Sequence, residues 1–516
     1  MKVDYNYKIY TPEQYAVSMA KIAIEKYLNS FPKEEIDNIK VADISCGSGN
    51  LLLAILEELL KISKEIYGEY RYKKSWITGF DIDETALELF EKRAKSLFIE
   101  YKIEGELNIK RCDSLCEAME EKYDIVLGNP PYLGEKNHKE IFQNIKETNF
   151  GKKYYQPKMD YFYFFIEKGI DILKENGILV YLTTNYWLKA DGAENLRGKL
   201  KKEGEFFRIE NYTYSIFKNA KGQHNVIFSW IKSGDEKIIE IIEDENRYSI
   251  YQDNIFTKEH NKIVLIPPVW KESIDSIRDR GNFNLGDLVN VNQGIVSGAD
   301  KVFVFKEYDE KFKDYLKPFY KNRDIGKYSV TEVPPFWIMY LNGKMELSST
   351  TFDYLDEFKQ LLSKRREVVH ERINWWELQW ARDEEIFIKP KIVVRQRCKT
   401  NNFAYTEREF YGSADIYYLT GKTPDINLFY LLGYLNSEAF FYWFNYIGKK
   451  KGKNLEFYST PLKESPIYYP KDESELLYIE GLVKKQLENY QEEIQKEIDS
   501  YFNNKLGINI KRLTQK

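Results

Sequence analysis

The chain has 516 residues, a length that predicts more than one domain, and it carries a formal net charge of −4. Its four cysteines form no Cys-x-x-Cys pair and no Cys/His ligand set, so we expect neither a disulfide framework nor a bound metal. No signal-peptide pattern follows Met1 and no run of about 20 apolar residues occurs, so we expect a cytoplasmic protein, associated with the nucleoid, without a membrane segment.

The first motif with a chemical meaning is a glycine turn at the end of an apolar strand. Val41–Ile44 is apolar apart from Asp43 and leads into Gly47-Ser48-Gly49, and a helical pattern opens at Leu51. Glycines at such a turn let the backbone approach a ligand closely, and the helix N-terminus favours polar or negative groups. Because a lone Gly-x-Gly is weak evidence, its meaning depends on the motifs that follow.

Two further strands end next to acidic residues. A strand over Trp76–Phe80 leads to Asp81, and the next short strand ends just before Asp113. In a parallel sheet, an acid at the end of the second strand is placed to accept hydrogen bonds from ribose hydroxyls. We therefore expect Asp81 to hold a ribose and Asp113 to meet an adenine amine.

A fourth strand, Tyr123–Gly128, is followed by Asn129-Pro130-Pro131-Tyr132. Two prolines cannot continue the strand, because each lacks an N–H and has a fixed φ, so the chain must leave the sheet in a rigid turn. Such a turn lies where open α/β sheets bind ligands. The Asn129 carboxamide oxygen and the Pro130 carbonyl can accept both protons of one exocyclic amine while Tyr132 stacks on its ring. The motif predicts a site for a planar, amino-bearing base.

This order of motifs resembles that of the gamma-class DNA adenine-N6 methyltransferases. Ile9–Glu13 matches the family's Thr-Pro element, and Gly177–Leu188 resembles its fifth-strand motif. Ser215–Asn219 and Asn225–Trp230 match the hairpin that offers a second aromatic face to the target base. The resemblance implies an α/β, Rossmann-like domain that uses S-adenosylmethionine and acts on double-stranded DNA.

The resemblance also implies a role for individual residues. Phe217 is the candidate for the second aromatic face, with an ordinary core position as the alternative. The residues expected to bind the cofactor are Thr11, Asp43, Ser45, Gly47, Asp81, Ile82, Asp113, Ser114 and Asn129.

The expected chemistry depends on holding the target amine. An adenine N6 amine is a poor nucleophile because its lone pair is delocalised into the ring. If Asn129 and Pro130 hold both amine protons, the lone pair becomes localised, and positioning and electrostatics carry catalysis without a strong base. The amine is shielded inside duplex DNA, so the base must be flipped out. Cytosine-C5 methylation is excluded, because it needs a cysteine next to a proline and no cysteine here follows one.

The rest of the chain predicts a second domain that reads the target. The segments that resemble a TaqI-type target-recognition domain, which implies a mixed α+β fold, are Leu285–Phe303, Leu316–Ile325, Trp375–Leu378 and Tyr430–Ser437. We divide the chain into a catalytic domain, a connecting segment, a DNA target-recognition domain and a C-terminal helical segment, over residues 1–235, 236–280, 281–470 and 471–516.

Basic residues cluster in the C-terminal half of the chain. Their distribution matters more than the acidic net charge, because only the binding groove meets phosphate. A charge run is usually a solvated face, but three clusters interleaved with aromatic residues in one domain favour DNA contacts. The candidates are Arg365, Arg366, Trp375, Arg395, Arg397, Lys399, Lys449, Lys450, Lys451 and Lys453.

Several functions stay open at this point. The favoured one is a monomeric DNA adenine methyltransferase, either the modification enzyme of a restriction-modification system or an orphan, and RNA is the alternative substrate. A fused restriction-modification enzyme is disfavoured, since the Thr-Pro element begins near residue 11 and no nuclease motif is evident, although a separate cognate endonuclease is compatible. A DNA-binding module without transfer activity is disfavoured by the intact Asp81, Asn129 and Tyr132.

Overall fold

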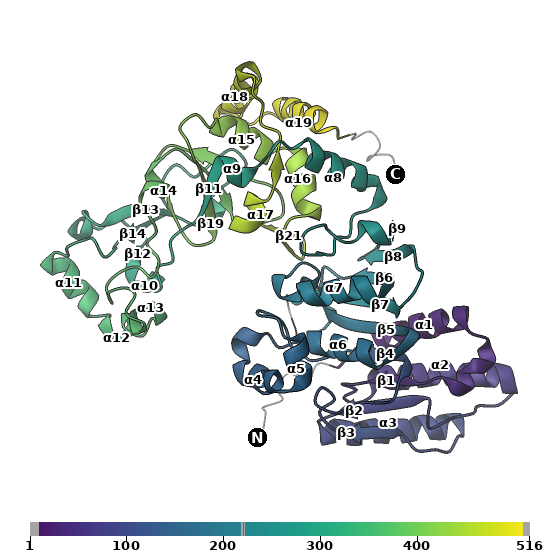
Figure 1. Cartoon of the computed structure of the whole chain (residues 1–516). Coiled ribbons are helices and arrows are strands. Elements are labelled where there is room, and N and C mark those ends of the chain that lie inside the picture. The colour runs from purple at the N-terminus through teal and green to yellow at the C-terminus, as the bar shows by residue number, and fades with distance from the viewer. Residues whose placement is uncertain (1–9, 218–219, 221, 509–516) are drawn as a thin grey trace. The chain divides into compact units, whose positions relative to one another are not determined.

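The computed structural model describes residues 10–217, 220 and 222–508 of two compact units, which span residues 1–268 and 269–516 (Figure 1). The predicted fold class is confirmed, because an α/β unit is followed by a mixed α+β unit. The described residues do not include residues 1–9, where no export signal is expected. They also leave out residues 218–219, which follow Phe217. The finer division into four parts stays a prediction.

The first unit is built on a nine-stranded sheet of order β3-β2-β1-β4-β5-β7-β6-β8-β9. Strands β1 to β5 are parallel, β7 runs antiparallel between β5 and β6, β8 is parallel to β6, and β9 is antiparallel to β8. The strands are Val41–Asp43 (β1), Ile77–Asp81 (β2), Asn108–Arg111 (β3), Tyr123–Gly128 (β4), Leu173–Thr184 (β5), Gly204–Asn211 (β6), Asn225–Lys232 (β7), Ile238–Glu243 (β8) and Asn246–Tyr251 (β9).

Helices cover both faces of this sheet (Figure 1). The helices are Glu13–Ser30 (α1), Asn50–Tyr67 (α2), Glu84–Tyr101 (α3), Lys139–Glu147 (α4), Asn149–Tyr154 (α5), Phe162–Ile172 (α6) and Glu194–Glu203 (α7). One core contains residues of α1, α2 and α3 with Val41 and Ile125, and the other contains residues of α4, α6 and α7 with Ala42 and Val126. Neighbouring strand residues enter different cores because strand side chains alternate between faces. A parallel sheet covered on both faces explains why its strands are almost continuously apolar.

The fifth strand differs from its predicted position. The fifth-strand motif was expected over Gly177–Leu188, but β5 begins at Leu173 and ends at Thr184. The pairing with β4 shifts register within this strand, next to Asn176, whose φ is +61°. The left-handed conformation of Asn176 lets the chain bulge and rejoin the sheet, so β5 begins before the motif residues.

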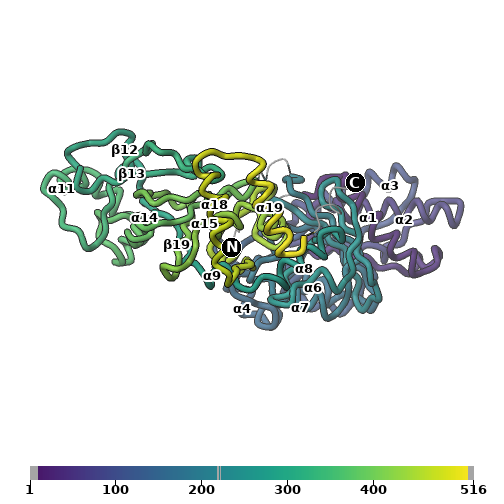
Figure 2. The backbone as a smooth tube through the Cα atoms, turned by 90° about the horizontal axis from the view of Figure 1, so that it is seen from above, coloured from purple at the N-terminus to yellow at the C-terminus, as the bar shows by residue number. Residues whose placement is uncertain are grey.

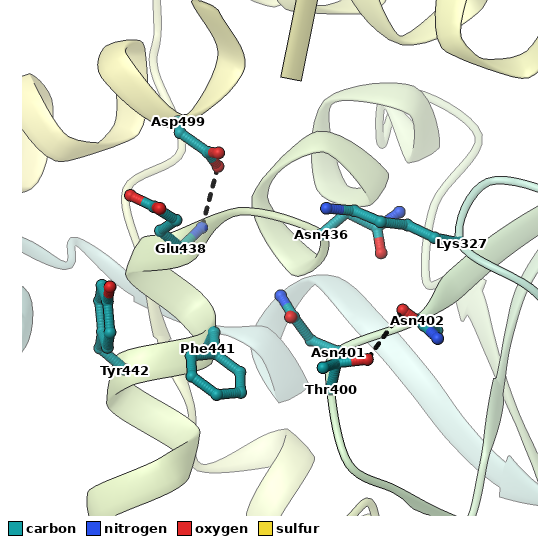
Figure 3. Close-up of a pocket in the computed structure, with 9 residues that line it drawn as sticks. All are labelled: Lys327, Thr400, Asn401, Asn402, Asn436, Glu438, Phe441, Tyr442 and Asp499. Atoms are coloured by element: carbon teal, nitrogen blue, oxygen red, sulfur yellow. Dashed lines mark hydrogen bonds between the residues drawn. The ribbon is translucent and has the colours of Figure 1, made fainter. Parts of the chain in front are cut away.

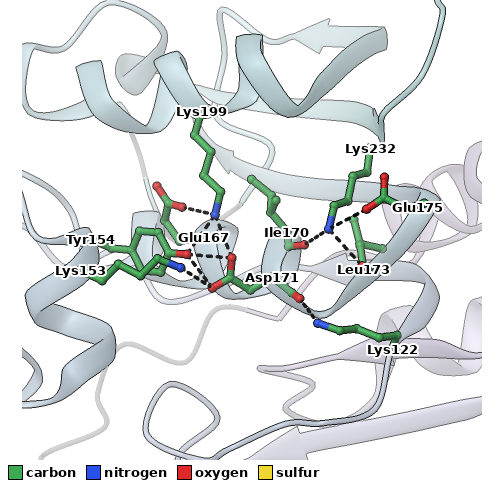
Figure 4. Close-up of polar contacts among 10 residues, drawn as sticks. All are labelled: Lys122, Lys153, Tyr154, Glu167, Ile170, Asp171, Leu173, Glu175, Lys199 and Lys232. Carbon is green, nitrogen blue, oxygen red and sulfur yellow. Dashed lines mark hydrogen bonds and ion pairs between the residues drawn. The ribbon is translucent and has the colours of Figure 1, made fainter.

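A cluster of charged side chains joins α5, α6 and α7 (Figure 4). Lys199 Nζ lies 2.8 Å from Glu167 Oε2 and 3.0 Å from Asp171 Oδ1. The hydroxyl of Tyr154, the last residue of α5, donates to Asp171 at 2.7 Å. Glu167 and Lys199 are almost fully shielded from solvent, with 5% and 13% of their side chains exposed. Because the shielded charges are paired with opposite charges, the cluster holds the three helices together.

The second unit combines small sheets with helices. Its sheets have the orders β11-β19-β15-β17, β12-β14-β13-β18, β16-β21-β20 and β10-β22. The strands are Phe283–Asn284 (β10), Val289–Gln293 (β11), Val304–Phe305 (β12), Leu316–Tyr320 (β13), Phe336–Met339 (β14), Lys391–Arg395 (β15), Arg397–Cys398 (β16), Phe403–Thr406 (β17), Tyr411–Gly412 (β18), Ile416–Gly421 (β19), Lys450–Lys451 (β20), Asn454–Glu456 (β21) and Pro466–Ile467 (β22).

Helices of the second unit form separate groups. Helices α10 to α13 lie with β12 and β14 at one end of the unit, α15, α18 and α19 pack together at the other, and α9 and α17 pack against β11 (Figures 1 and 2). The helices are Pro268–Arg280 (α8), Leu285–Leu288 (α9), Asp300–Phe303 (α10), Ser349–Asp356 (α11), Lys359–Leu362 (α12), Arg366–Val369 (α13), Glu385–Ile388 (α14), Leu428–Leu435 (α15), Glu438–Tyr446 (α16), Ser459–Lys463 (α17), Glu473–Glu488 (α18) and Glu492–Leu506 (α19). The predicted C-terminal helical segment contains two helices, α18 and α19.

The described residues contain neither a membrane-spanning helix nor a cluster of metal ligands. Within residues 10–217, 220 and 222–508, none of the helices combines the length and the apolar character needed to cross a bilayer. In the same part of the chain, no group of three or more His, Cys, Asp or Glu side chains is arranged to hold a metal ion.

Candidate active site

The polar residues predicted from the first four strands gather at one edge of the sheet of the first unit. Strands β3, β2, β1 and β4 are parallel neighbours in that order. The residues that follow their carboxyl ends therefore lie side by side, which is where open α/β sheets form ligand sites. The residues brought to this edge are Asp43, Ser45, Gly47, Asp81, Ile82, Asp113, Ser114 and Asn129.

The glycine loop after β1 is held by two carboxylates. Asp43 Oδ1 accepts a hydrogen bond from the Ser45 N–H at 2.9 Å, and Asp81 Oδ2 accepts one from the Gly47 N–H at 2.8 Å. Gly49 has a φ of +80°, and a Cβ there would lie 2.1 Å from the Phe90 ring, so only glycine fits. Asp43 is buried, which raises its pKa to about 7. The loop is thus a rigid backbone cradle.

The remaining candidate cofactor residues line the adjoining strand ends. Asp81 is half-buried, and its loss of solvent raises its pKa, while Ile82 beside it exposes 44% of its surface. The carboxylate of Asp113 is exposed, and Ser114 is buried with its hydroxyl donating to the Ile44 carbonyl at 2.6 Å. Ser114 therefore fixes the loop after β3, and Ile82 and Asp113 present an apolar and a polar group to a ligand.

Asn129, at the end of β4, contacts the Thr-Pro element directly. Its Nδ2 donates to the Thr11 hydroxyl at 3.1 Å, and its Oδ1 accepts from the Tyr132 hydroxyl at 2.6 Å. Thr11 is 4% exposed and stands immediately before Pro12 and α1. Two motifs that are 118 residues apart in the sequence therefore meet at one side chain.

Tyr132 is turned into the unit and not outward. Its hydroxyl also lies 3.1 Å from the Leu182 carbonyl, and its ring packs edge-on against Phe162 with 5.7 Å between the ring centres. Burial raises the pKa of this phenol well above its usual value. The Tyr132 hydroxyl is held by Asn129, and the stacking role of the ring stays a proposal.

The loop between β6 and β7 contains two candidates for the second aromatic face, Phe217 and Tyr214. Phe217, the residue chosen from the sequence, is 5% exposed and packs in a core with Tyr212 and Ile216. Tyr214 in the same loop is 50% exposed and packs edge-on against Tyr212. The sequence pattern did not single out Tyr214, because exposure of one residue in a loop has no periodic signal.

Asp160 is a second residue that the sequence did not reveal. Its Oδ1 accepts from the Leu133 N–H at 2.9 Å, directly after Tyr132, and its Oδ2 accepts from the Tyr186 hydroxyl. Asp160 is buried, which raises its pKa. Its contact with Leu133 spans 27 residues, so no local spacing could have predicted this support for the Asn-Pro-Pro-Tyr turn.

Two of the three basic clusters meet in the second unit. Strand β21 pairs with β16 on one side and β20 on the other, which places Arg397 and Lys399 beside residues 449–453. Buried Glu456 pairs with Arg397 at 2.7 Å and with Lys449 at 3.7 Å. We call this set the basic patch: Arg397, Lys399, Lys449, Lys450, Lys451 and Lys453.

The other DNA-contact candidates are placed differently. Arg365 is 8% exposed and donates to the backbone carbonyls of Leu362, Ser297 and Trp375, so we withdraw it from the candidates. Arg395 is half-buried and donates to the Ile325 carbonyl at 2.7 Å, and its role in DNA contact stays a prediction. Arg366 is exposed and Trp375 half-buried, and neither belongs to the basic patch.

A pocket of about 340 Å³ lies elsewhere in the second unit (Figure 3). Asn436 forms two hydrogen bonds of 2.9 Å with the backbone of Phe403, and Asn401 donates to the carbonyls of Leu435 and Ser437. These amides hold the 400–402 loop against α15 and α16, so their polar groups already serve the fold. We assign no ligand to this pocket.

Comparison with known proteins gives matches for both units. Residues 13–217 match the family model of the Eco57I restriction-modification methylase, and residues 317–467 match that of the TaqI-like C-terminal specificity domain. The type II methyltransferase M.HindII of Haemophilus influenzae is 27% identical over 435 residues, covering 75% of this chain and 84% of that protein. M.HincII of Haemophilus influenzae is 27% identical over 421 residues, covering 75% and 83%.

Among solved structures, the type IIL restriction-modification enzyme MmeI in complex with DNA has a similar fold. The TM-score is 0.70 at 12% sequence identity, and the match covers 98% of this chain and 77% of that chain. At this identity, the likeness is one of fold.

Proposed function

We propose a function for this chain from its family. The chain belongs to the Eco57I-type, gamma-class DNA adenine methyltransferases and carries a TaqI-like specificity domain. It transfers a methyl group from S-adenosylmethionine to the N6 amine of an adenine at a specific sequence in double-stranded DNA. The observation that carries this proposal is the hydrogen bond between Asn129 and Thr11 at the edge of the sheet, beside the glycine loop.

The residues around the glycine loop fit S-adenosylmethionine. The Ser45 hydroxyl is buried next to the Asp43 carboxylate, while Ile82 and Asp113 expose an apolar and a polar group to a ligand. Asp81 would accept hydrogen bonds from the ribose hydroxyls, Asp113 would meet the adenine amine, and Ile82 would cover the adenine ring. When bound, the cofactor supplies a methyl group on a positively charged sulfonium.

Replacing Asp81 tests this assignment. In Asp81→Ala the ribose loses charge-assisted hydrogen bonds worth about 1.5–3 kcal/mol, so we expect S-adenosylmethionine affinity to fall by about 10- to 100-fold in titration calorimetry. Glu84→Ala, which removes an exposed acid of α3 close by in the sequence, is the matched control and should bind normally. Wild-type affinity in Asp81→Ala would refute the ribose assignment.

Catalysis would rest on two acceptors at the end of β4. The Asn129 carboxamide oxygen and the Pro130 carbonyl hold the two protons of the target amine, which localises its lone pair on nitrogen. In this arrangement the Thr11 hydroxyl accepts from the Asn129 NH₂ group, which leaves the carboxamide oxygen, bonded to the Tyr132 hydroxyl, as the acceptor for the amine. Tyr132, with Phe217 or the exposed Tyr214, would stack on the flipped-out base.

The basic patch is the proposed phosphate contact of the specificity domain. Lys399, Lys451 and Lys453 are exposed, so they can neutralise phosphates without disturbing the core. Arg397 and Lys449 are aligned by their shared partner Glu456. Such contacts fix the position of the protein on DNA and do not by themselves read sequence.

Neutralising the basic patch should weaken DNA binding and its salt dependence. For the triple variant Lys399→Gln, Lys451→Gln, Lys453→Gln, each lost phosphate contact lowers the slope of log K against log salt by about 1, and affinity at low salt falls by about 10- to 100-fold. Fluorescence anisotropy over a salt series measures both. The matched control neutralises three exposed lysines near the C-terminus, Lys471, Lys485 and Lys496, and should keep the wild-type slope. An unchanged slope in the patch variant would contradict the proposal.

The proposed reaction is identified by its product. Purified protein is incubated with S-adenosylmethionine and either unmethylated duplex DNA or RNA, and the nucleosides are analysed by mass spectrometry. We expect N6-methyl-2′-deoxyadenosine from DNA and no methyladenosine from RNA. Methylation of RNA alone, or N4-methylcytosine as the product, would refute the proposed function.

We further propose that the protein acts as a monomer and modifies DNA for a restriction-modification system whose endonuclease is a separate protein. The support is the match to one specificity domain and the 27% sequence identity to the type II methyltransferases M.HindII and M.HincII of Haemophilus influenzae.

A further inference from the structure

Asn50 links the glycine loop to the Thr-Pro element. It is the first residue of α2, directly after Gly49, and its Nδ2 donates to the Thr11 carbonyl at 2.6 Å. Its Oδ1 accepts from the Arg93 guanidinium and from the Ser48 hydroxyl, the latter at 3.2 Å. Because a guanidinium can only donate, the carboxamide oxygen must face Arg93 and the NH₂ group must face Thr11. The orientation of Asn50 is therefore fixed.

Thr11 passes this constraint to the catalytic turn. Its carbonyl is held by Asn50, and its hydroxyl accepts from Asn129 Nδ2 at 3.1 Å. Residues that precede a proline have a restricted backbone, so Pro12 limits how far the Thr11 carbonyl and Cα can move independently. A displacement of the Thr11 carbonyl would therefore displace the group that orients the Asn129 carboxamide.

We propose that Asn50 is a positioning residue for methyl transfer: it fixes Thr11 and, through Thr11, the carboxamide of Asn129. The inference rests on the proposed function. The chain Asn50–Thr11–Asn129–Tyr132 runs from the glycine loop to the target-base side of the site through contacts of 2.6, 3.1 and 2.6 Å. A catalytic group misplaced by about 1 Å can cost about 10²-fold in rate, so this support acts on the chemical step.

The test uses Asn50→Asp in the full-length protein. Aspartate has the same shape and keeps acceptors for Arg93 and Ser48, but it replaces the donor to the Thr11 carbonyl with a second oxygen. We expect the single-turnover transfer rate, at saturating S-adenosylmethionine and DNA, to fall by about 10- to 100-fold. Lys95→Met, an exposed position of α3, is the matched control and should keep the wild-type rate.

A double-mutant cycle separates positioning from a general loss of structure. Thr11→Val cuts the next link by removing the hydroxyl that meets Asn129. If Asn50 and Thr11 act through the same series of hydrogen bonds, Asn50→Asp in the Thr11→Val background causes little further loss of transfer rate. Independent effects on the rate would instead multiply. If Asn50→Asp proves unstable by thermal melting, Asn50→Ser, which introduces no charge, takes its place in the cycle.

A second readout does not depend on activity. Hydrogen exchange of the backbone amides in the first turns of α1 should speed up in Asn50→Asp and stay unchanged in Lys95→Met, because Asn50 anchors the residue that precedes this helix. A wild-type transfer rate, multiplicative losses in the cycle or unchanged exchange would overturn the inference. Failure of the wild-type protein to methylate adenine would instead refute the proposed function, and the exchange experiment would still decide the Asn50–Thr11 link.

Discussion

Asn129→Ala is expected to lower the rate of methyl transfer by at least about 10²- to 10³-fold, the usual cost of removing one preorganised group from a transition state. The alanine has no oxygen to accept a proton of the target amine and no NH₂ group for the Thr11 hydroxyl. The hydrogen bonds that hold the glycine loop, to Asp43 and to Asp81, do not involve Asn129. The affinity for S-adenosylmethionine should therefore stay within about threefold of wild type. Single-turnover kinetics and titration calorimetry measure the two quantities.

A matched control is available in the same part of the unit. Asn211, at the end of β6, is also half-buried and bonds Asn185 Nδ2 through its side-chain oxygen at 2.8 Å. Asn211→Ala should lower stability without the large loss in rate. A wild-type rate in Asn129→Ala would show that the carboxamide of the Asn-Pro-Pro-Tyr turn has no part in the chemistry.

Lys199→Met is expected to destabilise the protein by about 3–5 kcal/mol, because it leaves a buried charge without its partner. Burial raises the pKa of Glu167, and Lys199 opposes that effect from 2.8 Å away. Burial also acts to raise the pKa of Asp171, but the hydrogen bonds from Tyr154 and Lys199 outweigh it, and the net pKa is lowered. Methionine matches the lysine stem in volume, so the loss reports the charge and not the packing. Urea unfolding of the protein measures the change.

The control for this prediction is Lys202→Met, which removes an exposed lysine from the same helix and should change stability by less than about 0.5 kcal/mol. Adding Glu167→Met to Lys199→Met removes the stranded carboxylate and should recover part of the loss. If Lys199→Met unfolds at the wild-type urea concentration, the cluster of Figure 4 does not hold α5, α6 and α7 together.

Much of the first unit could be predicted because its signals are local. Strand β4 occupies the predicted residues Tyr123–Gly128, since an apolar run followed by two prolines leaves no alternative. Helix α2 follows the glycine turn as its apolar spacing predicts. The predicted family is confirmed by the two family models. The expected start of the fifth strand, at Gly177, was wrong, because the left-handed conformation of Asn176 has no clear signature in the apolar pattern.

The contacts within the site could not be predicted in the same way. The sequence placed Asn129 and Thr11 in one site but gave no reason for a direct hydrogen bond, which depends on side-chain conformations and on contacts 118 residues apart. Charge patterns are equally ambiguous, because Arg365 lies in a basic run yet donates to backbone carbonyls inside the unit. The pairing of β16 with β21, which builds the basic patch, is a long-range contact without a local signal.

The most direct test of the central claim is single-molecule sequencing of unmethylated plasmid and genomic DNA after incubation with the purified protein and S-adenosylmethionine, with Asn129→Ala as the control. We predict N6-methyladenine at one recurring sequence with the wild-type protein and none with the variant. Absence of methylated adenine, from protein that binds S-adenosylmethionine in calorimetry, would contradict the assignment of this chain as a site-specific DNA adenine methyltransferase.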